Sequence, residues 1–138
     1  MLRHSLLIRS ATLAVALSAT SALAQTPEQT LASLKEQAAQ PPGFQGFSAI
    51  RGEQFFKSTH GNDWSCATCH TQNPAGMGKH ARTGKAIQPL APSANAKRFT
   101  DPAKFEKWFK RNCNDVVDRA CTAQEKGDVL TYLMTIGT

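Results

Sequence analysis

The sequence predicts an all-α domain, and three observations support this prediction. Between residues 105 and 116, apolar side chains recur at spacings of three and four, the period of an amphipathic helix. Near the C-terminus, Thr122 and Glu125 form the Ser/Thr-x-x-Glu pattern of a helix start, and an apolar run follows them. Around a Cys-x-x-Cys-His motif at residues 66–70, no alternation of apolar and polar residues indicates a strand. We therefore expect helices on both sides of this motif.

Residues 1–24 have the features of a secretory signal peptide. Arg3 and Arg9 make the start basic, residues 11–19 are a short apolar stretch, and Ala-Leu-Ala at residues 22–24 fits a small-residue cleavage site. The apolar stretch is too short to span a bilayer and continue as an anchor. We therefore expect export to a bacterial periplasm, no stable membrane insertion, and one domain at residues 25–138.

The domain is expected to begin with an N-terminal helical extension at residues 25–43. Thr26 and Pro27 are typical of a helix start, with the threonine as N-cap and the proline in the first turn. Leu31, Leu34 and Ala38 give a weak apolar stripe, and the Pro-Pro-Gly run at residues 41–43 ends it.

A second helix is predicted at residues 48–57, where Ile50, Phe55 and Phe56 are the apolar side chains. Gly52 lies inside this helix. Because glycine costs helix stability, its expected use is the close approach of another backbone. Tyr132, in the last predicted helix, is the residue that we expect to cross it.

The Cys-x-x-Cys-His motif is the attachment signature of c-type haem. Cys66 and Cys69 would add to the two vinyl groups of one haem c, and His70 would then reach the iron as the proximal ligand. A thioredoxin-like redox pair needs a βαβ setting that the surrounding sequence does not show. A zinc half-site is the other reading. Trp64 lies just before the motif and is expected either to pack on the haem or to join the core.

Residues 71–99 are expected to be irregular, because glycines and prolines interrupt the whole stretch. Its most apolar section, residues 86–92, includes Leu90 and is expected to lie against one face of the haem.

A third helix is predicted to start at Thr100 or Asp101, either of which can cap it, with Pro102 in the first turn. On a wheel of about 100° per residue with Phe105 at zero, Phe109 falls near 40°, Asn112 near 340° and Val116 near 20°. Asn112 is therefore a polar amide in the middle of an apolar face, and it needs a partner if it is buried.

This asparagine is one candidate for the second axial ligand of the iron, through its amide oxygen. His80, in a flexible loop, is a rival, and Met77 and Met134 are weaker alternatives. A local hydrogen bond, or a fraying helix end, would also explain Asn112. Phe105, Trp108 and Phe109 would form a wall of the pocket.

The last helix starts at Thr122, and the other two cysteines, Cys113 and Cys121, precede it. Disulfides persist in an oxidising compartment, so a bridge between them is one expectation. A bridge would tie the helix end at Asn112 to the start of the last helix. A four-cysteine zinc site shared with the motif is the alternative, although it leaves His70 unused.

The formal net charge of the chain is +6, and the charge is uneven. Nine lysines and arginines lie at residues 79–111, against only Asp101 and Glu106. A solvated surface is the ordinary explanation. The alternative is a docking face for an acidic redox partner. Nucleic acid is not an expected partner of an exported haem protein.

Four segments together resemble the sphaeroides haem protein (SHP) family of monohaem cytochromes c. They are residues 64–70 (WSCATCH), 84–92 (GKAIQPLAP), 107–113 (KWFKRNC) and 121–126 (CTAQEK). The likeness runs from about Gly52 to Leu133, and its specific part is the arrangement of Asn112, Cys113 and Cys121.

The resemblance implies a class I cytochrome c fold, here with three core helices around one covalent haem and the extra N-terminal helix. It implies His70 and Asn112 as axial ligands, a disulfide beside Asn112, high-spin haem, and release of the asparagine on reduction. It also implies binding of O₂ and NO, with a dihaem cytochrome c and a membrane cytochrome b as electron donors, and a possible nitric oxide dioxygenase or oxygen-reducing activity.

Three hypotheses for the function follow. The first is a periplasmic cytochrome that binds O₂, NO and CO at Fe(II), accepts electrons from a partner cytochrome and can oxidise NO. The second is a plain electron carrier with His80 or a methionine as sixth ligand. The third is a sensor or ligand-storage protein without turnover.

Overall fold

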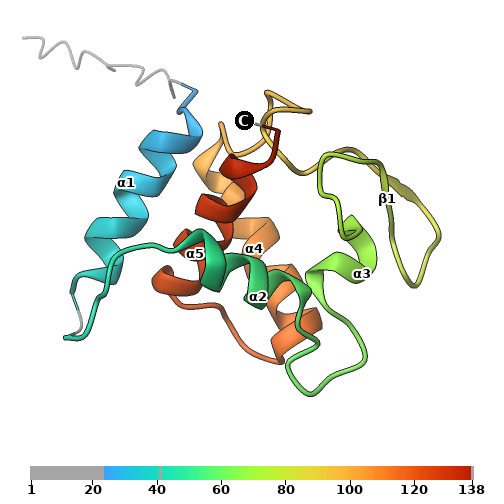
Figure 1. The fold of residues 1–138 in the computed structure, drawn as a ribbon, viewed down its shortest axis with the longest axis horizontal. Coiled ribbons are helices and arrows are strands. Elements are labelled where there is room, and N and C mark those ends of the chain that lie inside the picture. The colour runs from blue at the N-terminus through green and yellow to red at the C-terminus, as the bar shows by residue number, and fades with distance from the viewer. Residues whose placement is uncertain (1–23, 41, 138) are drawn as a thin grey trace, which may run out of the picture.

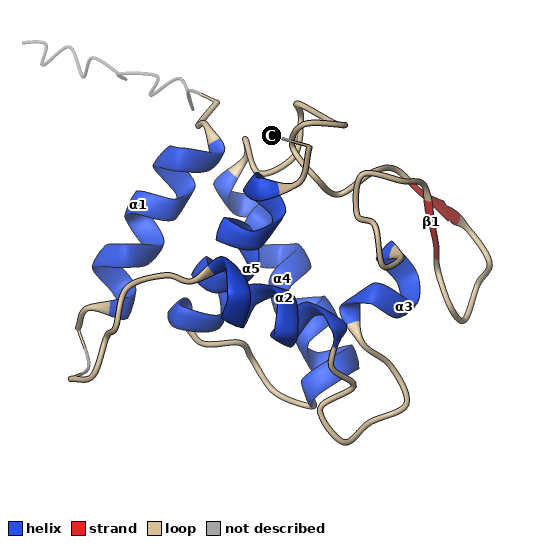
Figure 2. Ribbon diagram, viewed as in Figure 1, coloured by secondary structure: helices blue, strands red, loops and turns tan. Residues whose placement is uncertain are grey.

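The computed structural model describes residues 24–40 and 42–137, and helices make up nearly all of its regular secondary structure (Figures 1 and 2). The elements in chain order are α1 (Pro27–Ala38), α2 (Ala49–Lys57), α3 (Cys66–His70), β1 (Gly78–Lys79), β2 (Ala86–Ile87), α4 (Pro102–Val117) and α5 (Ala123–Thr135). The prediction of an all-α fold is confirmed. The predicted signal peptide falls outside the described residues except for its last residue, Ala24.

Side-chain caps set the starts of the long helices, as the sequence predicts. Thr26 accepts a hydrogen bond from the backbone N–H of Gln29 at the start of α1, and the Gln29 side chain accepts one from the Thr26 N–H. Asp101, rather than Thr100, caps α4 by accepting from the N–H of Lys104 at 3.0 Å. The predicted capping box of Thr122 and Glu125 starts α5.

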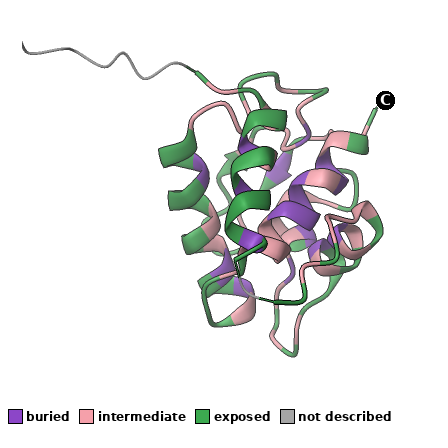
Figure 3. Cartoon of the chain, turned by 90° about the vertical axis from the view of Figure 1, so that its left-hand side faces the viewer, coloured by how far each residue is buried: buried purple, intermediate pink, exposed green. Residues whose placement is uncertain are grey.

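Helix α5 lies in the centre of the molecule, where α1 and α2 pack against it (Figure 1). Its buried residues follow one another almost without a gap over about two turns, whereas the outer helices bury single faces (Figure 3). A side chain at Gly52 of α2 would collide with the backbone of Asp128, so α2 and α5 touch backbone to backbone. The predicted close approach at Gly52 is confirmed. The contact is with Asp128, which lies one helical turn before Tyr132, the residue that the sequence suggested.

The crossing of α2 and α5 is fixed by a buried carboxylate. Asp128 is only 4% exposed, and it accepts hydrogen bonds from the Ser48 N–H at 2.7 Å, from Arg51 Nε at 2.8 Å and from Gln124 Nε2 at 3.0 Å. These donors replace the water that the carboxylate loses on burial. Next to this network Phe56 is fully buried, whereas Ile50 is exposed.

The N-terminal extension packs on the domain as α1. Leu34 is buried in one cluster with Phe105 of α4 and Leu130 of α5. The Thr30 hydroxyl also donates to the Phe99 carbonyl at 3.0 Å, and the Gln25 N–H donates to the Thr100 carbonyl at 2.9 Å. Helix α1 therefore holds the chain where α4 begins.

The segment between α3 and α4 is less irregular than the sequence predicts. Residues of β1 and β2 form a short antiparallel ladder, in which Lys79 faces Ala86. The connecting turn is closed by hydrogen bonds from the His80 N–H to the Lys85 carbonyl and from the Gly84 N–H to the His80 carbonyl, both 2.8 Å. Gly84 has φ +68°, a conformation that glycine adopts without strain. A two-residue ladder is too short to leave a period in the sequence.

Within the described residues, we find no helix that is both long and apolar enough to cross a membrane.

Candidate haem site

Side chains from four helices and from the segment after β1 surround a cavity of about 540 Å³. Its volume lies within the range of about 300–1,000 Å³ that is usual for cofactor and ligand sites. Every residue that the sequence predicts for the cofactor and the iron contributes to its wall: Trp64, Cys66, Cys69, His70, Leu90, Phe105, Trp108, Phe109 and Asn112. The structure therefore brings together residues that are up to 48 positions apart in the chain.

The motif forms its own helix, α3, which begins at the N-cap Ser65 with a capping box to Thr68. Residues three and four apart on a helix lie on one face. This spacing gives Cys66, Cys69 and His70 a common side, and all three contact the cavity. Neither cysteine is part of a disulfide, so both are available for thioether bonds.

Burial determines the charge of these groups. It raises the pKa of the Cys66 thiol to about 12, so this thiol is neutral. Burial, helped by the positive charge of Arg98, lowers the pKa of His70 to about 4, so the imidazole is also neutral. Neutral imidazole is the form that binds metals. Among the described residues neither ring nitrogen of His70 has a hydrogen-bond partner, and the Phe56 ring lies 6.4 Å from its centroid.

This donor set fits a covalent haem c. Two thiols and one neutral imidazole lie on one short helix at the edge of a cavity, and the rest of the wall is mainly aliphatic and aromatic. A porphyrin needs such an apolar enclosure, with the thiols at its edge and the imidazole below the iron. Cys66 and Cys69 would hold the haem through thioether bonds, and His70 would be the iron ligand.

Helix α4 supplies a separate wall of the cavity. Phe105 is buried in it, and Phe109, half-buried, packs with its ring centroid 4.6 Å from that of Phe105. Asn112 lies one turn further and is half-buried at the cavity. Within the described residues its amide has no hydrogen-bond partner, so a local hydrogen bond does not explain it. Asn112 also lies within α4 and not at a frayed end, since the helix continues to Val117.

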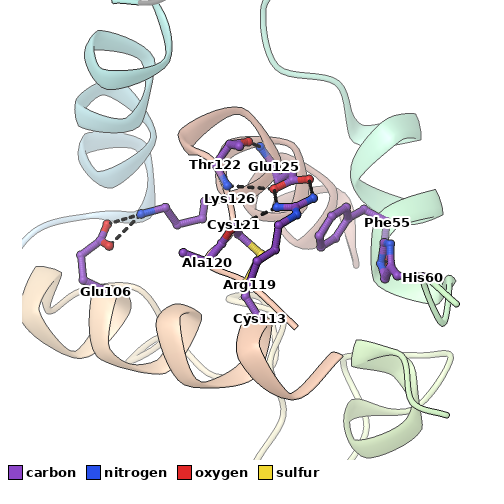
Figure 4. The surroundings of a disulfide bond; sticks show 10 residues. All are labelled: Phe55, His60, Glu106, Cys113, Arg119, Ala120, Cys121, Thr122, Glu125 and Lys126. Carbon is purple, nitrogen blue, oxygen red and sulfur yellow. Dashed lines mark hydrogen bonds and ion pairs between the residues drawn. A yellow bond between two sulfur atoms is a disulfide. The ribbon is translucent and has the colours of Figure 1, made fainter. Parts of the chain in front are cut away.

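The cysteine pair beside Asn112 forms a disulfide, Cys113–Cys121, with Cα atoms 5.7 Å apart (Figure 4). The four-cysteine zinc alternative is therefore wrong, since two of its ligands are bonded to each other. Next to the bridge, Arg119 donates two hydrogen bonds to the Glu125 carboxylate, at 2.8 and 2.6 Å. Lys126 of α5 pairs with Glu106 of α4 at 2.7 Å.

The rival axial ligands lie in less suitable places. Met77 is 51% exposed, and Met134 packs against the cluster of Leu34, Phe105 and Leu130; neither side chain lines the cavity. His80 does line it. Its Nδ1 accepts from the N–H groups of Arg82 and Thr83, at 3.2 and 3.3 Å.

The next residue, Ala81, donates its N–H to the sulfur of Cys69 at 3.3 Å. His80 is thus held close to α3, the helix that also carries His70.

Sequence reasoning missed Arg98 as part of this site. Its Nε donates to the Pro89 carbonyl at 2.8 Å, and its second nitrogen donates to the Gln88 carbonyl at 2.7 Å. The guanidinium thereby fastens the segment that carries Leu90 to the cavity wall. Burial lowers the pKa of Arg98 from its usual value. The sequence contained no signal for this role, because Arg98 is one of many cations in that region.

Comparison with known proteins agrees with this site. Residues 42–133 match a protein family described as a domain of unknown function, DUF1924. The chain is 44% identical over 98 residues to cytochrome c'' of Methylophilus methylotrophus, covering 68% of each chain. It is 44% identical over 112 residues to the cytochrome c-type protein SHP of Cereibacter sphaeroides, covering 78% of this chain and 82% of the relative.

Solved structures give the same result. The structure of oxidised SHP, described as an oxygen-binding cytochrome c, matches with a TM-score of 0.70 at 44% identity, over 80% of this chain and 96% of the other. The crystal structure of oxidised cytochrome c'' from Methylophilus methylotrophus matches with a TM-score of 0.69 at 38% identity, over 81% of this chain and 95% of the other.

A helical fold around one cavity, with a single Cys-x-x-Cys-His helix in its wall, defines a monohaem c-type cytochrome, which binds one covalent haem c. Within that class the chain belongs to the SHP family, as the residues around Asn112 and the disulfide suggested. The predicted fold class and cofactor are confirmed.

Proposed function

We propose that this cytochrome binds O₂, NO and CO when its iron is reduced, and that Asn112 controls access to the second axial position. Cys66 and Cys69 would hold the haem, and His70 would be the first ligand of its iron. Support comes from the relatives: SHP is described as an oxygen-binding cytochrome c, and a solution structure of cytochrome c'' addresses haem-ligand detachment.

The observation that carries this proposal is the unpartnered amide of Asn112 in an aromatic wall. Asn112 is half-buried, and its amide atoms are accessible, since no buried side-chain nitrogen or oxygen atom of the described residues lacks a partner. Asn112 has no hydrogen-bond partner in the described part of the chain, yet it reaches the same cavity as His70 from a different helix. An axial ligand for the iron is a role that uses its amide oxygen.

When bound, ferrous haem with a free axial position supplies the site for small diatomic ligands and for one-electron exchange. The amide oxygen of Asn112 is a hard, neutral donor, so it favours Fe(III) over the softer Fe(II). Asn112 would therefore be held by the oxidised haem and released from the reduced haem, and its release would leave room for a small ligand.

The remaining wall residues keep this position dry. Phe105, Val129 and Leu133 are buried at the cavity, and Phe109 is half-buried there. These four side chains offer neither hydrogen bonds nor charge, so the part of the wall that they form favours small apolar gases over water. The disulfide limits how far Asn112 can move, since the next residue, Cys113, is bonded to Cys121 just before α5.

The proposal includes export to the periplasm and electron supply by other redox proteins. The resemblance to the family implies a dihaem cytochrome c and a membrane cytochrome b as donors. Oxidation of nitric oxide, NO + O₂ + e⁻ → NO₃⁻, requires one electron per NO, so a donor is necessary for turnover.

Absorption spectra of the holoprotein test the proposal. We expect a high-spin ferric spectrum, and rapid CO binding after reduction with dithionite. A low-spin spectrum in both states, with no response to CO, contradicts it and supports the electron carrier with His80. Consumption of NO under O₂ with excess reductant identifies an enzyme, and its absence identifies a ligand-binding protein.

A further inference from the structure

One side of α4 carries a strip of exposed cations around a tryptophan. Lys107 and Trp108 are adjacent, and each lies three or four residues from both Lys104 and Arg111, so the four form a continuous strip, here called the α4 strip. Trp108 is 46% exposed. The Lys107 ammonium lies 5.9 Å from its ring centroid, and the Arg111 guanidinium lies 5.7 Å from it.

The charge around the α4 strip is positive after its acids are counted. Asp101 is engaged as the cap of α4 and pairs with Lys104 at 3.2 Å. Glu106 pairs with Lys126 of α5 at 2.7 Å. Asp115, one turn beyond Arg111, is the other acid beside the strip.

Further cations add to the strip. Lys110 is exposed on α4, and Lys97 and Arg98 line the same cavity as the strip. A surface of this sign attracts an acidic protein over a distance of about one Debye length.

The α4 strip also borders the haem cavity. The side chains of Lys104, Trp108 and Arg111 are part of the cavity wall as well as of the surface. A protein that covers the strip therefore comes next to the cofactor cavity and to the helix that carries Asn112. Tryptophan and arginine are also the residue types that dominate binding energy at protein interfaces.

We propose that the α4 strip is the docking surface for an acidic one-electron carrier protein. The proposal rests on the proposed function, because it concerns the electron that reduces the iron. In the transfer, one electron leaves the carrier, which is oxidised, and the haem iron goes from Fe(III) to Fe(II). No proton or group moves with it. Weak electron-transfer complexes bury little surface, so a short strip with strong steering is sufficient.

The test is the rate at which a reduced, acidic plant-type [2Fe–2S] ferredoxin reduces the ferric holoprotein under anaerobic conditions. At low ionic strength we expect a second-order rate that falls steeply as salt is added. Lys107→Glu is expected to lower this rate about tenfold or more and to flatten its salt dependence. Lys107 does not line the cavity, so reduction by dithionite and subsequent CO binding are expected to stay as in the wild type.

Lys35→Glu is the matched control. Lys35 is exposed on α1, and its reversal changes the net charge by the same amount away from the cavity. Its ferredoxin rate should stay within about twofold of the wild type. Equal losses in both variants, or no loss in Lys107→Glu, overturn the proposal. So does a wild-type protein that dithionite reduces and ferredoxin does not. A wild-type protein that ferredoxin reduces but that does not bind CO contradicts the proposed function. The rates of the two variants still test the docking surface in that case.

Discussion

Cys113, in the last turns of α4, is bonded to Cys121, which lies just before the start of α5, and their Cα atoms are 5.7 Å apart. Asn112 is the residue just before this bridge, and Thr122, the N-cap of α5, is the residue just after it. The bridge therefore fastens the part of α4 that carries Asn112 to the start of α5. Helix α5 is the centre of the fold (Figures 1 and 4).

Removing the bridge should destabilise the holoprotein. Cys113→Ser with Cys121→Ser frees a loop of about nine residues, which lowers the free energy of unfolding by about 2.6 kcal/mol on a loop-entropy model. Urea unfolding of the double variant measures the change. The reduced wild type should show the same loss, because it lacks the same bond. An unchanged midpoint in both would show that the bridge is dispensable for stability.

Helix α1 should contribute to the stability of the whole domain. Leu34 is 1% exposed between Phe105 and Leu130, so Leu34→Ala is expected to cost about 2–5 kcal/mol. Leu31 is only half-buried at the edge of the same cluster, and Leu31→Ala should cost less. Chemical unfolding measures both losses. If Leu34→Ala unfolds like the wild type, α1 does not support the domain.

Arg98 should affect both stability and the reduction potential. Arg98→Met removes two hydrogen bonds to Gln88 and Pro89, a loss of about 1.5–3 kcal/mol. It also removes a positive charge near the iron site, which should lower the midpoint potential because Fe(III) becomes less unfavourable. Arg98→Lys keeps the charge but not both hydrogen bonds. We expect it to lower stability while the potential, measured by redox titration, changes little. A potential that falls equally in both variants would exclude the charge as the cause.

The pair of Glu125 and Arg119 should make stability depend on acidity. Burial raises the pKa of Glu125, but hydrogen bonds from Arg119 and from the Thr122 N–H outweigh it, so the pKa lies below its usual value. A lowered pKa in the folded state stabilises the fold at pH values above the ordinary glutamate range. That contribution is lost as the pH falls through the lowered pKa.

Comparison of the wild type with Glu125→Gln isolates this contribution. At pH 7 the variant should be less stable by about 0.5–1 kcal/mol, since Arg119 is half exposed. The difference should shrink towards zero in acid, because the wild-type carboxyl is then protonated. Unfolding curves between pH 7 and pH 3 measure it. A difference that stays constant over this range would contradict the ionic origin.

Sequence reasoning located the parts of this molecule that are periodic or capped. The helices around Phe105 and after Thr122 have strong apolar periods and clear N-caps, and the structure has both. Sequence reasoning also predicted many residues of the cavity wall. The Cys-x-x-Cys-His spacing and the apolar face of α4 are both patterns within a short stretch of sequence.

Contacts between distant segments were the part that could not be predicted. Arg98 reaches two carbonyl groups about ten residues earlier, and nothing in its own neighbourhood indicates them. The backbone of Asp128 at Gly52 likewise depends on how α2 and α5 cross. A glycine indicates that something comes close, but it does not indicate which residue.

If Asn112 occupies the second axial position of the ferric haem, its release must precede the binding of azide, so the rate of azide binding to the ferric holoprotein tests its role directly. In the wild type, release of Asn112 should limit this rate. Asn112→Val removes the amide at nearly the same volume, so we expect an altered ferric spectrum and azide binding at least about tenfold faster. Asn114→Val, an exposed position on the same helix outside the cavity, should behave as the wild type. A ferric spectrum and an azide rate that are the same in Asn112→Val and the wild type would contradict this role.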